Sequence, residues 1–422
     1  MTVILVPMGS AGDVYPFIGL GAALRSRGHR VEVVANSYYQ SAVERGGLSF
    51  VELGTYEDLR PGIEDPNLWH RWKGFVVLGR VILPLMRRLY DIIASRYVPG
   101  ETVVAASSLA LAARVAQEKL GVPLVTVHLQ PAAIRSAYDD PGVLPRLLSA
   151  RWLRVPLKRL LDWLADVLLL NPTFGHEVNA LRTDLGLPAV RRPFHRWTHS
   201  PQRVLGLFPD WFAPPQPDWP VQTRLTGFPL YDDPGREGLP KEAEHFLAGG
   251  DPPVVFSPGS VMKHGREFFT ESVTACRLLG RRGLLLTRFD EQVPGGLPEG
   301  VRHFHYLPFS QVLPRAAALV SHGGIGSVSQ ALAAGVPQLV MPMAFDQFPN
   351  ATRLEQLGVA RSLPVTDYRG PAVARALGEL LASPAVADQC RTLAGRFRQR
   401  NSLEEACLAI EDLGPEARAC SR

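Results

Sequence analysis

One short stretch of the chain combines residue types that hold phosphate with residue types that hold a sugar. A short apolar run precedes His322, and a helix-forming run follows at 327–334. A glycine-rich turn between them leaves unpaired backbone N–H groups at a helix start, where the dipole is positive, so it suits phosphate. Gly324 and Gly326 let a phosphate approach the backbone because no Cβ intervenes, and His322 and Ser327 add side-chain donors.

A second chemical element follows the next expected strand. Asp346 and Gln347 place an acid beside an amide, which offers acceptors and donors together and suits neighbouring sugar hydroxyls. A further candidate phosphate loop, Pro258 to Ser260, follows the strand expected at 254–257. The alternative for the turn at 322–327 is an ordinary strand–helix connection of an α/β fold.

Asp13 is the residue that suggests acid–base chemistry in the first half of the chain. It follows a strand expected at 2–7, so it lies at the carboxyl edge of a sheet, where ligands bind in open α/β folds. The alternative is that it caps a helix beginning near Pro16. The loop lacks the full G-x-G-x-x-G pattern, and the next strand ends in Ala35-Asn36 without an acid, which disfavours dinucleotide binding and hydride transfer.

The elements that position these residues alternate between strand and helix along the chain. Expected strands lie at 2–7, 31–35, 102–106, 124–127, 254–257, 283–287, 301–307, 317–320 and 338–342. Expected helices lie at 17–27, 108–119, 267–279, 327–334, 371–382 and 385–413. This alternation is typical of the α/β class with parallel sheets.

The length of 422 residues suits two large domains. A shift to proline and aromatic residues predicts a stiff connection between them. We therefore expect an N-terminal Rossmann-like domain at 1–205, a linker at 206–225, a second Rossmann-like domain at 226–395 and a closing helix at 396–422.

Composition excludes several classes of protein. The net charge of +5 is modest, and no basic run alternates with aromatics as a nucleic-acid surface would. The four cysteines have neither metal-ligand nor redox spacing, and no signal peptide is evident, so we expect a cytoplasmic protein with reduced thiols. No uncharged run reaches the ~18–20 residues that span a bilayer. Residues 151–169 mix basic and apolar residues at helical spacing, which favours a core-facing helix and leaves a membrane-surface helix as the alternative.

An ordered set of residues in the second half resembles the nucleotide-sugar signature of family 1 glycosyltransferases. Their GT-B fold consists of two facing Rossmann-like domains with a C-terminal helix that packs back on the first. The set is His322, Gly324, Ser327, Pro337, Pro342, Asp346, Gln347 and Asn350. The resemblance implies that His322 and the small residues after it hold the diphosphate and that Asp346-Gln347 holds the sugar.

The same resemblance extends to three other donor-binding positions. Ser260 occupies the place of a serine that contacts the diphosphate, and Leu307 lies where the family holds the nucleobase through backbone atoms. Gln330 occupies the place of an acid that often binds the ribose. Because Gln330 is an amide, the resemblance supports a ribose-binding role less strongly for this residue. The reaction needs no metal by this interpretation, because the chain contains no Asp-x-Asp element and a helix dipole with His322 can replace one.

The loop Gly-Ser-Ala-Gly-Asp-Val at 9–14 looks like the N-terminal loop of sterol, glycopeptide and rhamnolipid glycosyltransferases. That likeness implies that Asp13 is a general base near the acceptor hydroxyl, with Ser10 and Gly12 in the donor site. Many relatives carry a histidine in this loop. This chain has none there, so Asp13 acts alone or with another partner.

Candidate acceptor contacts come from two regions. In relatives the segment with Trp69, Trp72 and Phe75 lines the acceptor pocket, and helix core packing is the alternative for each. His128 and Gln130 follow the strand at 124–127 and face the same sheet edge as Asp13. For His128 we keep open both an auxiliary-base role and a purely structural one.

Three further segments resemble the rhamnosyltransferase catalytic chain of bacterial rhamnolipid synthesis: 9–20, 191–220 and 226–232. The resemblance implies an inverting transfer of rhamnose from dTDP-rhamnose to the hydroxyl of a lipophilic acceptor such as a hydroxyalkanoyl lipid. It also leaves open an acceptor-supplying protein partner and a peripheral contact with the inner face of a membrane.

Three other functions remain as alternatives. The first is a UDP-glucose-dependent enzyme that acts on a carotenoid, sterol or polyketide. A nucleotide-sugar 2-epimerase would need no acceptor pocket, so the aromatic region at 69–86 argues against it. A non-catalytic nucleotide-sugar sensor would need no base, so Asp13 argues against it.

Overall fold

The computed structural model describes residues 1–139, 151–232, 238–397, 399 and 401–414. The chain divides into two compact units, each with its own parallel sheet. Unit 1 comprises Met1–Gly9, Asp13–Tyr231 and Asn401–Arg422, and unit 2 comprises Ser10–Gly12 and Asp232–Arg400.

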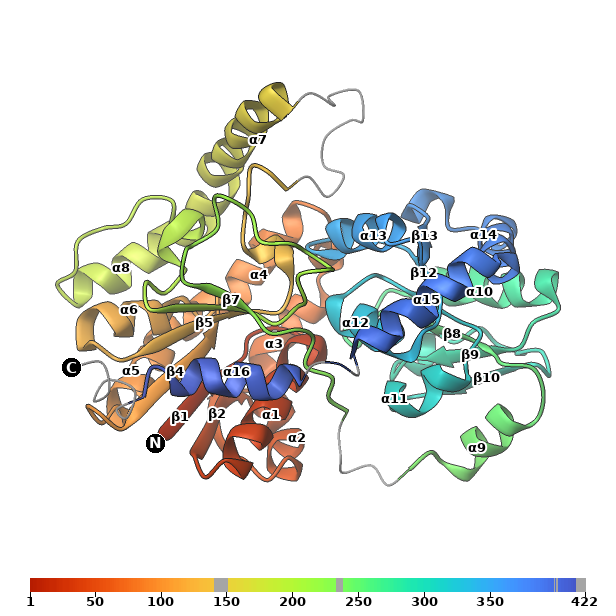
Figure 1. The fold of residues 1–422 in the computed structure, drawn as a ribbon, viewed down its shortest axis with the longest axis horizontal. Helices are drawn as coiled ribbons and strands as arrows, with labels where there is room; N and C mark the ends of the chain where they lie inside the picture. Colours follow the sequence, from red (N-terminus) through yellow and green to blue (C-terminus); the bar gives the residue numbers. More distant parts are fainter. Residues whose placement is uncertain (140–150, 233–237, 398, 400, 415–422) are drawn as a thin grey trace. The chain divides into compact units, whose positions relative to one another are not determined.

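A seven-stranded parallel sheet forms the centre of unit 1 (Figure 1). Its order is β3-β2-β1-β4-β5-β6-β7. The strands are β1 Thr2–Val6, β2 Arg30–Asn36, β3 Ser49–Gly54, β4 Thr102–Ser107, β5 Leu124–His128, β6 Arg203–Gly206 and β7 Thr223–Leu225. The central strands are buried at nearly every position, because helices cover both faces of a parallel sheet.

The connections of unit 1 explain why one edge of the sheet can bind ligands. The helices are α1 Ala11–Ser26, α2 Gln40–Arg45, α3 Tyr56–Glu64, α4 Lys73–Ile82, α5 Met86–Arg96, α6 Leu111–Leu120, α7 Arg151–Ala165, α8 His176–Asp184 and α16 Ser402–Glu411. The chain runs from β1 outward to β3 on one side and from β4 outward to β7 on the other. The strand order therefore reverses between β1 and β4, and in open α/β sheets the crevice at such a point binds ligands.

Unit 2 repeats this plan with six parallel strands in the order β10-β9-β8-β11-β12-β13. The strands are β8 Val254–Ser257, β9 Gly283–Leu286, β10 Val301–Phe304, β11 Ala318–Ser321, β12 Gln338–Val340 and β13 Ala360–Ser362. The helices are α9 Lys241–Ala248, α10 Arg266–Leu279, α11 Phe309–Val312, α12 Ile325–Ala334, α13 Gln347–Gln356, α14 Gly370–Ala382 and α15 Pro384–Phe397. Here the order reverses between β8 and β11.

Both faces of the unit 2 sheet are covered by apolar side chains. Val254 and Phe256 belong to one hydrophobic cluster, while Val255 between them belongs to another. Successive side chains of a strand point to opposite faces, so this alternation places one core on each side of the sheet. Near-continuous apolar strands in the sequence have this cause.

The last described helix packs on unit 1, as the resemblance implied (Figure 1, dark blue). Glu411 of α16 accepts hydrogen bonds of 2.7 Å from Arg27 and lies 2.7 Å from Nε2 of His29, both at the end of α1. Asp412 accepts a 2.6 Å bond from Arg224 in β7. The expected single helix at 385–413 is instead two helices, α15 in unit 2 and α16 in unit 1.

The segment 206–225, expected as a linker, is part of unit 1. Its strand β7 extends the sheet, and its buried apolar side chains include Leu207, Phe208, Phe212, Ala213 and Trp219. The ring of Phe212 packs edge-on against Phe228 at 5.2 Å. Prolines gave the segment the composition of a linker, but its aromatic residues pack against the sheet rather than spanning a gap. The division between the units falls later, at Tyr231 and Asp232.

Two local expectations also differ from the structure. Helix α1 begins at Ala11 rather than Phe17, so it contains Pro16, whose ring removes one intrahelical hydrogen bond. Strand β10 ends at Phe304 rather than Leu307, because the chain turns before the Pro308 that precedes α11.

Helix α7 does not bury its apolar side as expected. It extends away from the sheet of unit 1 (Figure 1). Leu160, Leu161 and Trp163 on α7 are exposed, as is Leu168 in the π-helical segment Asp166–Gly175 that follows. Among the described residues, no helix combines the length and apolar character that crossing a membrane requires.

Candidate active site

The turn after β11 presents the start of helix α12 at the switch point of unit 2. Gly324 is the N-cap of α12 and has no side chain with which to cap it. Gly323 has a φ of 86°, and a Cβ there would come within 2.6 Å of Val340 Cγ1, so only glycine fits without strain. The first amides of α12 therefore face the edge of the sheet with a positive dipole, as the sequence predicted.

His322 is packed between the two loops that meet at this switch point. A Cβ on Gly324 would lie 2.5 Å from its Nε2, and one on Gly259, in the loop after β8, would lie 3.0 Å from its Cε1. Gly259 has a φ of 113°, so its loop also needs glycine for its conformation. The structure thus brings the predicted loops at 258–260 and 322–327 together, because β8 and β11 are adjacent.

Burial lowers the pKa of His322 to about 4. The imidazole is therefore neutral at neutral pH in the unliganded protein. A neutral ring carries one N–H, so it can donate a single hydrogen bond to an anion while its other nitrogen can only accept.

Asn350 joins the turn at His322 to the Asp346-Gln347 segment. Its buried Nδ2 donates to Gly323 O at 2.9 Å and to Asp346 Oδ2 at 2.7 Å. Asparagine at this position can make both bonds because the residue lies one helical turn after Asp346, on the same face of α13. The sequence placed Asn350 in the signature without a role, and in the structure it joins the turn at Gly323 to Asp346.

Gln347 holds the shape of its own loop. Its Oε1 accepts hydrogen bonds from the amides of Met343 and Ala344, at 2.8 and 3.0 Å, and the side chain is buried. These bonds support Phe345, whose φ of 54° is unusual for a residue with a side chain. Only the amide nitrogen of Gln347 remains as a donor to a sugar.

The other predicted donor residues have mixed positions in unit 2. Ser260 is exposed, whereas the Leu307 side chain is buried in the core, which leaves its backbone as the part that could hold a base. Gln330 Nε2 donates to Asp232 at 3.3 Å, and Asp232 also accepts from the amide of Ser310 at 2.9 Å. Sequence reasoning assigned no site role to Asp232, because its contacts join segments about 80 to 100 residues apart.

Asp13 lies at the switch point of the unit 1 sheet, within the first turn of α1. It is not the N-cap of a helix near Pro16, since α1 begins two residues before it. The carboxylate covers Gly9, where a Cβ would clash with it, and Gly9 has a φ of 134°. An acid in the first turn is favoured by the helix dipole, so the fold stabilises a charged group at this edge.

The predicted acceptor residues come from several segments of unit 1 and differ in exposure. Trp69 ends the 3₁₀ helix Pro66–Trp69, while Trp72, more than half exposed, precedes α4 and Phe75 lies within it. Gln130 is partly buried after β5. His128, at the end of β5, is almost fully buried.

His128 and His199 form a buried pair that the sequence did not predict. Their rings meet edge-on with centroids 5.0 Å apart. Burial lowers the pKa of His128 well below its usual value, and the neighbouring His199 lowers it further. Burial also lowers the pKa of His199 to about 4, against a smaller opposing effect of a hydrogen bond with the backbone of Ala133.

The chain matches family models at both ends. Residues 3–138 match the glycosyltransferase family 28 N-terminal domain, and residues 286–411 match the erythromycin biosynthesis protein CIII-like C-terminal domain. The chain is also 32% identical to an O-mycaminosyltylonolide 6-deoxyallosyltransferase of Streptomyces fradiae, over 98% of this chain and 97% of that protein. It therefore belongs to the GT-B nucleotide-sugar glycosyltransferases.

Solved structures confirm the predicted fold. The glycosyltransferase of kitacinnamycin has a TM-score of 0.74 with this chain at 23% identity, and each chain is covered over 98% of its length. The glycosyltransferase VinC, solved in complex with dTDP, has a TM-score of 0.70 at 20% identity, over 99% of this chain and all of that one. The narrower resemblance to rhamnolipid rhamnosyltransferases stays a prediction.

Proposed function

We propose that this glycosyltransferase moves a deoxyhexose from a dTDP-sugar to a hydroxyl of a lipophilic natural product, with inversion and without a metal in the reaction. The observation that carries the proposal is the pair of hydrogen bonds made by Asn350. They tie a turn suited to a diphosphate to an acid and amide suited to a sugar, at the switch point where an open α/β sheet binds ligands.

The leaving group is stabilised by donors already in position. As the bond from the anomeric carbon to the diphosphate oxygen breaks, negative charge develops on that oxygen. The first amides of α12 begin at this edge of unit 2, where the neutral His322 ring also lies, and donors that need no reorganisation stabilise such charge best. These groups perform in this proposal what a divalent cation performs in metal-dependent transferases.

The sugar is held by the loop before α13. The Asp346 carboxylate accepts from sugar hydroxyls, and the amide nitrogen of Gln347 donates to one. Asn350 donates to one oxygen of the Asp346 carboxylate, which orients this carboxylate relative to the turn at His322. Gln330 donates one N–H to Asp232, so its amide oxygen and its second N–H are the groups it offers to a ribose hydroxyl.

Asp13 acts as the general base. It takes the proton from the acceptor hydroxyl as that oxygen forms its bond to the anomeric carbon from the side opposite the diphosphate, which inverts the configuration. The nucleoside diphosphate departs with the electron pair of the broken bond. Such a base typically contributes about 10²–10⁴-fold to the rate.

Two features support the choice of substrates. The relative from Streptomyces fradiae is named as a deoxysugar transferase acting on a tylonolide, and VinC was solved with dTDP, which together favour a dTDP-deoxysugar and a polyketide acceptor. The segments at 191–220 and 226–232 favour a second candidate, the rhamnosylation of a hydroxyalkanoyl lipid. A UDP-glucose donor is the remaining alternative.

A nucleotide screen followed by product detection tests the proposal. A ligand that binds only the native state raises the melting temperature by mass action, so dTDP is expected to raise it more than UDP or GDP. The preferred nucleotide, as its rhamnose or deoxyhexose conjugate, is then incubated with a macrolide aglycone and with a hydroxyalkanoyl lipid. Stabilisation by none of the three nucleotides would refute the donor site, and a preference for UDP would refute the dTDP assignment.

A further inference from the structure

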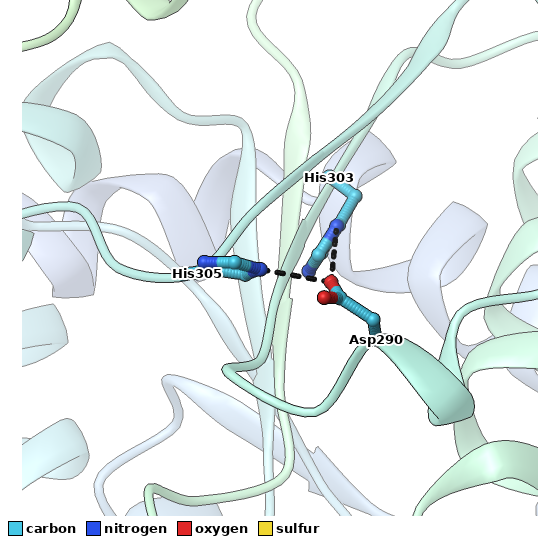
Figure 2. Close-up of side chains that lie close together, drawn as sticks. All are labelled: Asp290, His303 and His305. Carbon is cyan, nitrogen blue, oxygen red and sulfur yellow. Dashed lines mark hydrogen bonds and ion pairs between the residues drawn. The ribbon is translucent and has the colours of Figure 1, made fainter.

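A second cluster of chemically active side chains in unit 2 consists of residues that the proposed reaction does not use. Asp290 begins the 3₁₀ turn η7, Asp290–Gln292, which follows β9. His303 lies in β10, and His305 follows the end of that strand. Figure 2 shows the three side chains directed toward one another, and one ligand atom from each lies within 4.8 Å of the others.

The hydrogen bonds of His303 determine which of its nitrogens carries the proton. Its Nε2 lies 2.7 Å from the carbonyl oxygen of Thr287. A carbonyl oxygen can only accept, so Nε2 is the protonated nitrogen and Nδ1 of the neutral ring bears a lone pair. That lone pair faces Asp290 Oδ1 at 4.0 Å, which is too long for a hydrogen bond.

His303 has the tautomer and the hydrogen bond that are typical of a metal-binding histidine. Metal-binding histidines characteristically donate their second N–H to a carbonyl or carboxylate, which fixes the tautomer and aims the ligating nitrogen. A lone pair facing a carboxylate gains nothing without a cation between them. Asp290 also lies 2.8 Å from Nε2 of His305, where a cation would replace the shared proton.

The distances and donor types fit a tetrahedral divalent ion. With metal–nitrogen and metal–oxygen bonds of about 2.0–2.2 Å, ligand atoms of a tetrahedral zinc site are about 3.4 Å apart. The separations of 2.8 and 4.0 Å from Asp290 Oδ1 lie on either side of that value. Asp290 and His305 are exposed and can adjust, while the largely buried His303 supplies a fixed ligand.

We propose that Asp290, His303 and His305 bind one divalent transition-metal ion of the Zn²⁺ class, with water in the fourth position. Two imidazoles and a carboxylate select such an ion over Mg²⁺ or Ca²⁺, which prefer oxygen ligands. The ion links turn η7 to strand β10 and takes no part in the transfer of the sugar.

Turn η7 packs against the loop after β8, so an ion bound at η7 also affects that loop. Gln292, at the end of η7, is buried and donates from Nε2 to the carbonyl of Met262 at 2.6 Å. A Cβ on Gly265 would lie 2.6 Å from Gln292 Oε1, so the turn and the loop are closely packed. An ion that fixes η7 therefore also supports the loop that carries Gly259 and Ser260.

Zinc titration of the untagged, metal-free protein tests the proposal by calorimetry. The wild type is expected to bind one Zn²⁺ per chain, and Co²⁺ is expected to give the visible bands of a low-symmetry site. Asp290→Asn and His305→Ala are expected to weaken binding by more than the roughly 10–100-fold that loss of an outer-shell partner costs. The matched control is His245→Ala, because His245 is an exposed histidine on α9 outside the cluster. Absence of binding by the wild type, or equal binding by all four proteins, would overturn the proposal.

A measurement on the unmutated protein removes any dependence on the folding of the variants. Diethyl pyrocarbonate modifies accessible imidazoles, and mass spectrometry locates the modified residues. Zn²⁺ is expected to protect His305 and to leave His245 reactive. Equal modification of His305 with and without Zn²⁺ would contradict the proposed site.

Discussion

Acidification is expected to destabilise unit 1 through its buried histidine pair. His199 has a pKa of about 4 in the folded protein, because it is buried, against about 6.5 in an unfolded chain. The folded pKa is the lower one, so the folded state binds fewer protons than the unfolded state below pH 6.5. The contribution of His199 to the free energy of unfolding is therefore fully present above pH 6.5 and is lost as the pH falls toward 4.

The size of the effect follows from these two values. Proton linkage for a group with pKa values of about 6.5 and 4 lowers the free energy of unfolding by about 2 kcal/mol between pH 7.5 and pH 5. Below pH 4 the loss reaches about 3 kcal/mol, since each pKa unit corresponds to ~1.4 kcal/mol. His128, whose pKa is also lowered by burial, adds to this loss.

Urea unfolding followed by tryptophan fluorescence measures this prediction. All seven tryptophans lie between residues 69 and 219, so the signal follows unit 1. The perturbation is His199→Phe, which keeps an aromatic ring beside His128 and removes the titrating group. The variant is expected to lose about 2 kcal/mol less than the wild type between pH 7.5 and pH 5.

The matched control is His245→Phe, an exposed position in unit 2. It is expected to reproduce the pH dependence of the wild type. If His199→Phe also reproduced it, the reasoning that burial keeps this pair neutral would be refuted.

The remaining predictions concern the proposed reaction. Asp13→Asn is expected to lower kcat by about 10²–10⁴-fold, because the base is lost, while the melting-temperature shift by nucleotide persists; near-normal turnover would remove Asp13 from the mechanism. His322→Ala is expected to lower kcat by about 10²–10³-fold and to weaken nucleotide binding, because a donor to the leaving group is lost; unchanged kinetics would contradict that role. Asn350→Ala is expected to destabilise unit 2 by about 2–4 kcal/mol and to raise the KM for the donor, because two buried hydrogen bonds are lost. Thr352→Ala, on the same helix, is the control. An equal change in KM in Thr352→Ala would contradict the positioning role of Asn350.

The glycine-rich turn before α12 was predictable from the sequence because its residues are close together in the chain. Gly324 and His322 are two residues apart in the chain, and a glycine-rich turn before a helix presents unpaired backbone amides whatever its tertiary surroundings. The alternation of strands and helices likewise determined the class of fold, since parallel strands require crossover connections. The family resemblance rested on such local patterns, and the comparisons confirmed it.

Contacts between distant segments were decided only by the tertiary structure. The proline-rich segment 206–225 has the composition of a linker, yet its aromatic residues bury against unit 1, because burying apolar area outweighs the local preference of the chain. The pairing of His128 with His199, and of Asp290 with His303 and His305, depends on which strand ends lie side by side. A sequence lists the side chains that can react, but strand order and burial determine which of them meet and which remain charged.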